Sequence, residues 1–182
     1  MRDFLFIHIP KNAGQSMRQV LKPHDRCKHR EYTTKACVYF NRMSADEFRS
    51  VFSFAFVRNP WDRQVSFYEF IRKTPTHSLH KDTVGLSFYE YIHTIFPYHP
   101  VVFEYQKGYT HSCDKQLVNF VGRFENIEED FDFVCSKIGL KLQLPKINTT
   151  PHGHYREYYC EETQRMVGDA FIDDITTFGY DF

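Results

Sequence analysis

The residues best suited to chemistry come directly after an apolar run at residues 4–9. A lysine, a glycine and several polar side chains follow in a segment that we call the lysine loop: Pro10, Lys11, Asn12, Ala13, Gly14, Gln15 and Ser16. A loop that joins a strand to a helix presents free N–H groups to an anion, and a lysine adds positive charge. The lysine loop therefore suits a phosphate or sulfate group; the alternative is an ordinary turn with a surface lysine.

The lysine loop is not a Walker A motif, in which the lysine follows the second of two glycines. Here Lys11 precedes Gly14, which is the single glycine of the segment. The spacing therefore disfavours a magnesium-dependent kinase or nucleotide hydrolase. Such an enzyme is kept as an alternative function.

A second group of polar residues follows the apolar run at residues 53–57. Arg58 stands at the end of this run, where a magnesium-dependent phosphotransferase would often carry an aspartate. A guanidinium is a rigid fork that binds a phosphate through two hydrogen bonds, and Ser66 adds a hydroxyl two turns into the next helix. Asp62 and Arg63 are interpreted as a surface or structural pair. Two cations without an evident metal aspartate suggest a ligand with two separate anionic ends.

The predicted elements explain how these residues reach one edge of a sheet. Short runs rich in β-formers predict buried strands at residues 4–9, 53–57 and 117–124. Apolar spacing and cap residues predict helices near residues 14–21, 44–51, 59–72, 87–95, 126–138 and 155–171. Loops are predicted at 73–85, 97–112 and 141–154. Alternating strands and helices indicate an α/β fold with a central, mostly parallel sheet flanked by helices, in a single domain over residues 1–182.

The charges balance over the whole chain but not along it. The 182 residues include 23 basic and 23 acidic side chains, which disfavours a uniformly basic nucleic-acid binder. Residues 1–35 hold eight basic side chains against three acidic ones, and residues 157–182 hold seven acidic against one basic. The asymmetry indicates either that the N-terminal third faces an anion or that the charges lie on a solvated surface of mixed charge. The 19 Phe, 12 Tyr and 1 Trp predict a well-filled interior, with Trp61 packing at the sheet edge.

Neither a signal peptide nor a membrane span is evident in the sequence. The first apolar run meets Pro10 too early, and no stretch approaches the roughly 18 apolar residues of a span. The cysteines are odd in number and lack C-x-x-C spacing: Cys27, Cys37, Cys113, Cys135 and Cys160. This pattern favours reduced thiols in a cytoplasmic protein over disulfides or a zinc site, so no metal is expected.

Several segments resemble the sulfotransferases that use 3′-phosphoadenosine 5′-phosphosulfate (PAPS). The lysine loop resembles their I-P-K-T-A-G-T-S loop, and residues 56–66 resemble their F-V-R-N-P-[YW]-D-R-x-V-S element. Residues 121–126 match a third block, and residues 155–182 are similar to the usual C-terminus. The likeness is to the branch of carbohydrate sulfotransferases, such as heparan sulfate 2-O-sulfotransferase. It implies the P-loop-NTPase-like sulfotransferase fold and sulfuryl transfer from PAPS to an acceptor hydroxyl, with a carbohydrate as acceptor.

The resemblance also implies roles for individual residues. Lys11 contacts the bridging oxygen and the transferring sulfuryl group, while the rest of the lysine loop holds the 5′-phosphosulfate. Arg58 and Ser66 hold the 3′-phosphate. The loop from residue 146 to 154 closes over the nucleotide, with Lys146 and Thr149 as candidate contacts.

The chain departs from the family pattern at two places. Asn12 and Gln15 replace two common threonines, which removes hydroxyls but leaves amide donors. Residues 148–150 read N-T-T where the family often has N-K-T, so a basic contact is missing or comes from Lys146. His8 is predicted to pack beside the lysine loop.

An acceptor hydroxyl must lose a proton, and histidine is the usual base near neutral pH. His29 resembles the family's histidine in K-H-A-T after the first helix; His24 is the alternative, and both could instead be surface histidines. Lys28, Arg30 and Lys35 either attract an anionic acceptor or are solvated. A non-catalytic anion- or glycan-binding module on the same fold is the third function class. Saccharides and other small molecules are the expected partners, without nucleic acid.

Overall fold

The computed structural model describes residues 3–24, 35–36, 38, 43–145 and 153–182. The chain divides into two compact units. Unit 1 comprises Met1–Arg58 and Gln106–Asn148, and unit 2 comprises Asn59–Tyr105 and Thr149–Phe182. The prediction of a single domain is not tested by this division. Among the described residues, no helix has the length and apolar character needed to cross a membrane.

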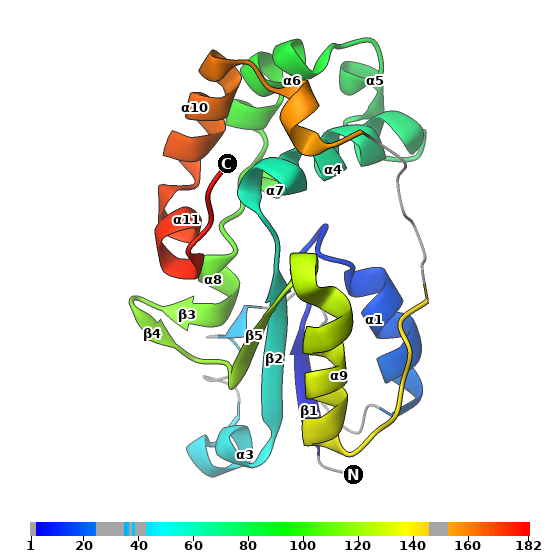
Figure 1. Ribbon diagram of the computed structural model, residues 1–182, viewed down its shortest axis with the longest axis vertical. Helices are drawn as coiled ribbons and strands as arrows, with labels where there is room; N and C mark the ends of the chain where they lie inside the picture. The colour runs from blue at the N-terminus through cyan, green and yellow to red at the C-terminus, as the bar shows by residue number, and fades with distance from the viewer. Residues whose placement is uncertain (1–2, 25–34, 37, 39–42, 146–152) are drawn as a thin grey trace. The chain divides into compact units, whose positions relative to one another are not determined.

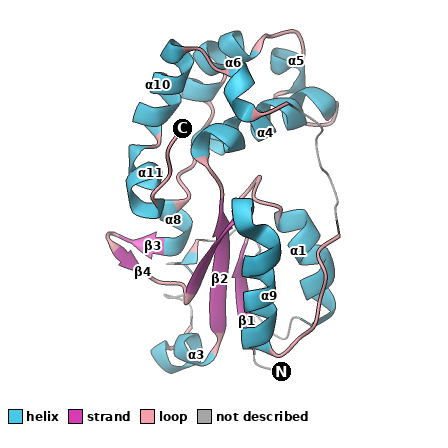
Figure 2. Cartoon of the chain, viewed as in Figure 1, coloured by secondary structure: helices cyan, strands magenta, loops and turns pink. Residues whose placement is uncertain are grey.

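Unit 1 is built on a parallel sheet of three strands, coloured magenta in Figure 2. The strands are β1 (Phe4–Ile7), β2 (Phe52–Val57) and β5 (Phe120–Arg123), with β2 in the middle. The β1–β2 pairing runs from Phe4 with Phe52 to Ile7 with Ala55, so these two strands are parallel. The β2–β5 pairing, which starts at Phe54 with Phe120, is parallel as well. The sheet confirms the predicted α/β class with a parallel sheet.

The third strand is shorter than the predicted range of residues 117–124. Before β5 begins, the Asn119 side chain bonds to the edge of β2: its Oδ1 accepts the Ser53 backbone N–H at 2.8 Å. The Asn119 N–H donates to the Ser53 carbonyl, also at 2.8 Å. A side chain has therefore taken the place of a regular ladder bond, and the strand begins at Phe120, three residues after the predicted start.

Helices α1 (Gly14–Leu21) and α9 (Ile127–Ile138) pack on the same face of the sheet (Figure 1). Side chains alternate along a strand, and the phenylalanines at every second position of β1 and β2 all point to this face. These rings form one core with residues of both helices: Phe4, Phe6, Phe52, Phe54, Phe56, Met17, Leu21, Phe131, Val134 and Ile138. Part of the aromatic excess therefore fills the interior of unit 1, and part fills the core of unit 2, in agreement with the predicted well-filled interior.

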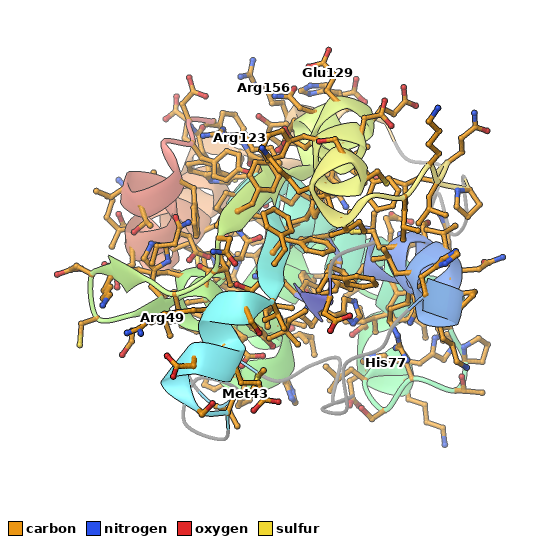
Figure 3. The ribbon with its side chains drawn as sticks, turned by 90° about the horizontal axis from the view of Figure 1, so that it is seen from below. Met43, Arg49, His77, Arg123, Glu129 and Arg156 are labelled. Carbon is orange, nitrogen blue, oxygen red and sulfur yellow. The ribbon has the colours of Figure 1, made fainter. Side chains whose placement is uncertain are left out.

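The remaining elements of unit 1 are short. They are a 3-10 helix (Lys22–His24), α3 (Ala45–Ser50), α8 (Lys107–Thr110), a hairpin of β3 (His111–Ser112) and β4 (Lys115–Gln116), and a 3-10 helix (Phe124–Asn126). Ser44 caps α3 by accepting the Glu47 N–H, as its spacing predicts. Figure 3 shows Arg49 on α3 and Glu129 on α9, both at the exposed surface. Asn126 precedes α9, but its side chain makes no capping bond, contrary to the sequence-based expectation.

Unit 2 is helical. It contains α4 (Pro60–Lys73), α5 (His80–Thr83), α6 (Phe88–Thr94), α7 (Pro100–Phe103), α10 (Glu161–Ala170) and α11 (Ile172–Phe178), with 3-10 helices at Phe96–Tyr98 and Tyr155–Tyr158. Asn59 caps α4 by accepting the Trp61 N–H at 3.0 Å, and Ser87 with Glu90 forms the predicted capping box of α6. The predicted helix at 155–171 is instead two elements, the 3-10 helix Tyr155–Tyr158 and α10, and the predicted loops at 73–85 and 97–112 contain α5, α7 and α8.

Two interpretations of residues in α4 are corrected by the structure. Trp61 is a packing residue as predicted, but it belongs to the core of helical unit 2 and not to a sheet edge. Its Nε1–H donates to the Gln164 carbonyl at 2.9 Å. Arg63 is not at the surface: it is fully buried, and its Nη1 donates to the Glu104 carbonyl at 2.8 Å.

Candidate functional site

The lysine loop leaves the end of β1 in an unusual backbone conformation. Lys11 and Ala13 both have positive φ angles, of 71° and 57°. Each left-handed non-glycine residue costs about 1 kcal/mol or more. Between them Asn12 is 1% exposed, and its Nδ2 donates to the Phe56 carbonyl at 2.7 Å and to Gln106 Oε1 at 2.8 Å. These two buried bonds hold the strained loop against the end of β2.

Lys11 and Arg58 are brought together by this arrangement. The Arg58 Nη1 donates to the Lys11 carbonyl at 3.1 Å. Burial, with a smaller effect of the nearby Arg58 charge, lowers the pKa of Lys11 from its usual value to about 7. The ends of two adjacent strands therefore supply two cations to one place, as the sequence predicts.

Arg58 is buried and its side chain contacts an aromatic ring. It follows β2, is 6% exposed, and lies with its guanidinium 4.0 Å from the centre of the Phe124 ring. A cation over a ring face is attracted by the ring's quadrupole. A guanidinium carries five N–H donors in a planar fork, a geometry suited to binding an anion through two hydrogen bonds.

Gln106 is the residue that sequence reasoning missed. It is fully buried, its Oε1 accepts the Arg58 backbone N–H at 2.9 Å, and its Nε2 donates to the Arg58 carbonyl at 2.8 Å. It lies directly before α8, in a segment predicted as loop. No motif marks it in the sequence, because its role depends on bonds to Arg58 and Asn12, which lie 48 and 94 positions earlier in the chain.

The start of α1 packs tightly against His8. A Cβ on Gly14 would overlap the His8 ring, so a glycine is needed here for close packing. His8 is 8% exposed, and burial, with a smaller effect of Arg18, lowers its pKa to about 4. The imidazole is therefore neutral at pH 7, and its predicted position beside the lysine loop is confirmed. Of the two predicted polar donors, Gln15 is exposed and Ser16 is buried.

The described structure does not place the other predicted site residues relative to Lys11 and Arg58. Ser66 is a buried residue of α4, in unit 2, whereas Lys11 and Arg58 belong to unit 1. His29, Lys146 and Thr149 lie outside the described residues. Within the described ranges, no group of three or more His, Cys, Asp or Glu residues is arranged to hold a metal ion.

Comparison with known protein families matches residues 2–181 to the family described as "Sulfotransferase family". The chain belongs to the sulfotransferase family. The match covers nearly the whole of this sulfotransferase, and the parallel sheet flanked by helices agrees with the fold of the family. The resemblance seen in the lysine loop and around Arg58 is thereby confirmed.

One relative adds an independent comparison to the family match. A protein of Archaeoglobus fulgidus with the name "Uncharacterized protein" is 32% identical to the sulfotransferase over 118 residues. The match covers 64% of this chain and 92% of that protein. Family membership supports a transferase that moves sulfuryl groups, and the relative's name says nothing more about acceptor or mechanism.

Proposed function

We propose that this sulfotransferase transfers the sulfuryl group of PAPS to a hydroxyl of a carbohydrate acceptor. The observation that carries the proposal is the pairing of Lys11 with Arg58 at the ends of adjacent strands, where Arg58 Nη1 bonds to the Lys11 carbonyl. PAPS has anionic groups at both its 3′ and 5′ positions, so it needs a few fixed cations and no basic surface. The balanced net charge of the chain is compatible with such a ligand.

The residues present fit an anionic donor on electrostatic grounds. Two cations held close together disfavour each other's charge, and Arg58 contributes to the lowered pKa of Lys11. An anion bound beside them offsets this repulsion and favours the charged form of Lys11. Binding is therefore expected to take up a proton near pH 7, which is a property of the chain's own residues.

Each proposed role follows from the chemistry of the transfer. The bond between sulfur and the bridging phosphate oxygen breaks, a bond from the acceptor oxygen to sulfur forms, and adenosine 3′,5′-bisphosphate leaves. Lys11 stabilises the charge that develops on the leaving phosphate oxygen, with help from the rest of the lysine loop. Arg58 and Ser66 hold the 3′-phosphate, and Lys146 and Thr149 contact the nucleotide. His29 accepts the proton of the acceptor hydroxyl.

The acceptor and the setting are part of the same proposal. Lys35, half-buried with its Nζ 5.8 Å from the centre of the Tyr109 ring, is proposed with Lys28 and Arg30 to attract an anionic saccharide. The whole chain is proposed to act as one sulfotransferase domain, because the family match runs through both units. A cytoplasmic setting is proposed because the cysteine pattern favours reduced thiols.

Adenosine 3′,5′-bisphosphate is expected to raise the melting temperature of the protein without magnesium. A ligand at about 100 times its Kd adds about 2.7 kcal/mol to the free energy of unfolding. For a chain of this size that shift corresponds to roughly 5–10 °C. Differential scanning fluorimetry measures it, with adenosine 5′-monophosphate as the control that lacks the 3′-phosphate. No shift at millimolar bisphosphate, or a shift with magnesium-ATP alone, contradicts the proposal and favours the kinase class.

Replacement of His29 by alanine is expected to abolish transfer and to keep donor binding. Loss of a general base lowers kcat by about 100- to 10,000-fold, while the bisphosphate Kd stays within about twofold. Transfer is measured with ³⁵S-labelled PAPS and the acceptor found in a panel of saccharides. The matched variant is His24→Ala, at the other candidate base. Normal turnover in His29→Ala together with lost turnover in His24→Ala would move the base to His24.

A further inference from the structure

Two buried side-chain amides continue the hydrogen bonding of the sheet beyond its last strand pairs. The regular ladder ends at Ile7 with Ala55 on one side of β2 and at Val57 with Arg123 on the other. Past these pairs, Asn12 Nδ2 donates to the Phe56 carbonyl at 2.7 Å. The next backbone N–H and C=O, those of Arg58, bond to Gln106.

Gln106 satisfies both backbone groups of Arg58 with one carboxamide. Its Oε1 accepts the Arg58 N–H at 2.9 Å, and its Nε2 donates to the Arg58 carbonyl at 2.8 Å. The same Oε1 accepts a second bond, from Asn12 Nδ2 at 2.8 Å. A carbonyl oxygen has two lone pairs, so Oε1 is fully used. Gln106 is therefore bonded to both segments that carry the cations, the lysine loop and the end of β2.

We propose that Gln106 is a positioning residue that sets the spacing and orientation of Lys11 relative to Arg58. It acts through Asn12 on the lysine loop and through the backbone on Arg58. The catalytic role of Gln106 rests on the proposed function, because the spacing of the two cations affects transfer only if both cations bind the donor. The effect on the spacing of the cations can be measured without any donor.

The chemistry of Asn12 explains why an amide occupies this place in the loop. One NH₂ group donates to two acceptors, the Phe56 carbonyl and Gln106 Oε1. A threonine hydroxyl, which is common at this position in the resembling family, has a single O–H to donate. Asn12 and Gln106 therefore work as a pair, and Asn12→Thr removes one of the two links while leaving Gln106 bonded to Arg58.

The test compares Gln106→Met, which keeps the volume without the amide, and Gln106→Asn, whose amide is one methylene shorter. In both, the Kd for adenosine 3′,5′-bisphosphate is expected to rise about 10-fold or more, measured by calorimetry. Asn12→Thr is expected to give a smaller rise. In protein with ¹³C-labelled lysine, the Lys11 signal, assigned by its loss in Lys11→Met, is expected to titrate closer to its usual range. A looser loop exposes the ammonium to water and separates it from Arg58.

Gln64→Met is the matched control. Gln64 is also fully buried, and its Nε2 donates to the Val102 carbonyl at 2.7 Å, but it belongs to unit 2. It is expected to lower the melting temperature and to leave the Lys11 titration and the bisphosphate Kd unchanged. Circular dichroism identifies which variants are folded. If Gln106→Met does not fold, Gln106→Asn and Asn12→Thr decide the question.

The outcomes separate this proposal from the proposed function. A lower melting temperature in the Gln106 variants, with Lys11 titration and Kd equal to the wild type, would show a purely structural glutamine and overturn the positioning role. If the wild-type protein does not bind the bisphosphate, the proposed function fails. The Lys11 titration of the same variants still decides whether Gln106 positions the two cations.

Discussion

Replacement of Lys11 by methionine is expected to lower the rate of sulfuryl transfer by roughly 100- to 1,000-fold. The loss corresponds to one charge-stabilising group at the atom where negative charge develops in the transition state. Methionine keeps most of the apolar stem, so packing around the half-buried side chain changes little. The bisphosphate Kd is expected to rise by about tenfold, the effect of one lost hydrogen bond to a charged group.

The Lys11 experiment uses ³⁵S transfer from PAPS for kcat and calorimetry for Kd. Lys115→Met serves as the control, because Lys115 is an exposed residue of the β3–β4 hairpin in the same unit. Its kcat is expected to equal that of the wild type. Undiminished turnover in Lys11→Met, with background enzyme excluded by a mock purification, would remove Lys11 from the mechanism and favour a non-catalytic anion-binding module.

Replacement of Gly14 by alanine is expected to destabilise the fold by about 2–3 kcal/mol, a typical cost of overpacking. The new Cβ overlaps the His8 ring, which is 8% exposed and stacked on Phe6 with 6.0 Å between ring centres. The ring has little room to move, so the start of α1 must shift. The melting temperature is expected to fall by roughly 4–12 °C, and the bisphosphate to bind more weakly, because Gly14 is part of the lysine loop.

Two further variants separate the steric cause from a general effect of losing a glycine. Gly85→Ala is the matched control: apart from the glycine and its chain neighbours, no atom of the described residues lies within 4 Å of the position of its Cβ, so its stability should change by less than about 0.5 kcal/mol. The double variant His8→Ala with Gly14→Ala removes the ring that the new methyl meets. It should be more stable than the sum of the two single changes predicts. Strict additivity would mean that the His8 ring is not the obstacle.

Local sequence signals predicted most of the elements correctly. The phenylalanine-rich runs at β1 and β2 are buried, and Ser44, Asn59 and Ser87 cap the helices that follow them. These signals are reliable because apolar runs and cap bonds involve residues close together in the chain. The errors came where a residue bonds to a partner far away in the chain. Asn119 bonds to Ser53, which shortens β5, and Arg63, one alternative for which was a surface position, is buried and bonds to the Glu104 carbonyl.

The sequence predicted some residues of the candidate site and missed others for the same reason. The sequence predicted Lys11 and Arg58 as a pair of cations, because the carboxyl ends of parallel strands meet at one edge of a sheet. It did not indicate that Gly14 accommodates the His8 ring, which the structure shows. It gave no sign of Gln106.

The sequence by itself determined the family, the parallel α/β fold and the two cation-bearing strand ends, because each depends on short motifs and on periodicity. Only the tertiary structure decided how the cations are held: the left-handed backbone at Lys11 and Ala13, the two bonds of Asn12, and the carboxamide of Gln106 on the Arg58 backbone. The physical reason is range. A motif records what neighbours along the chain can do, whereas a buried amide is satisfied by acceptors that only folding brings within reach.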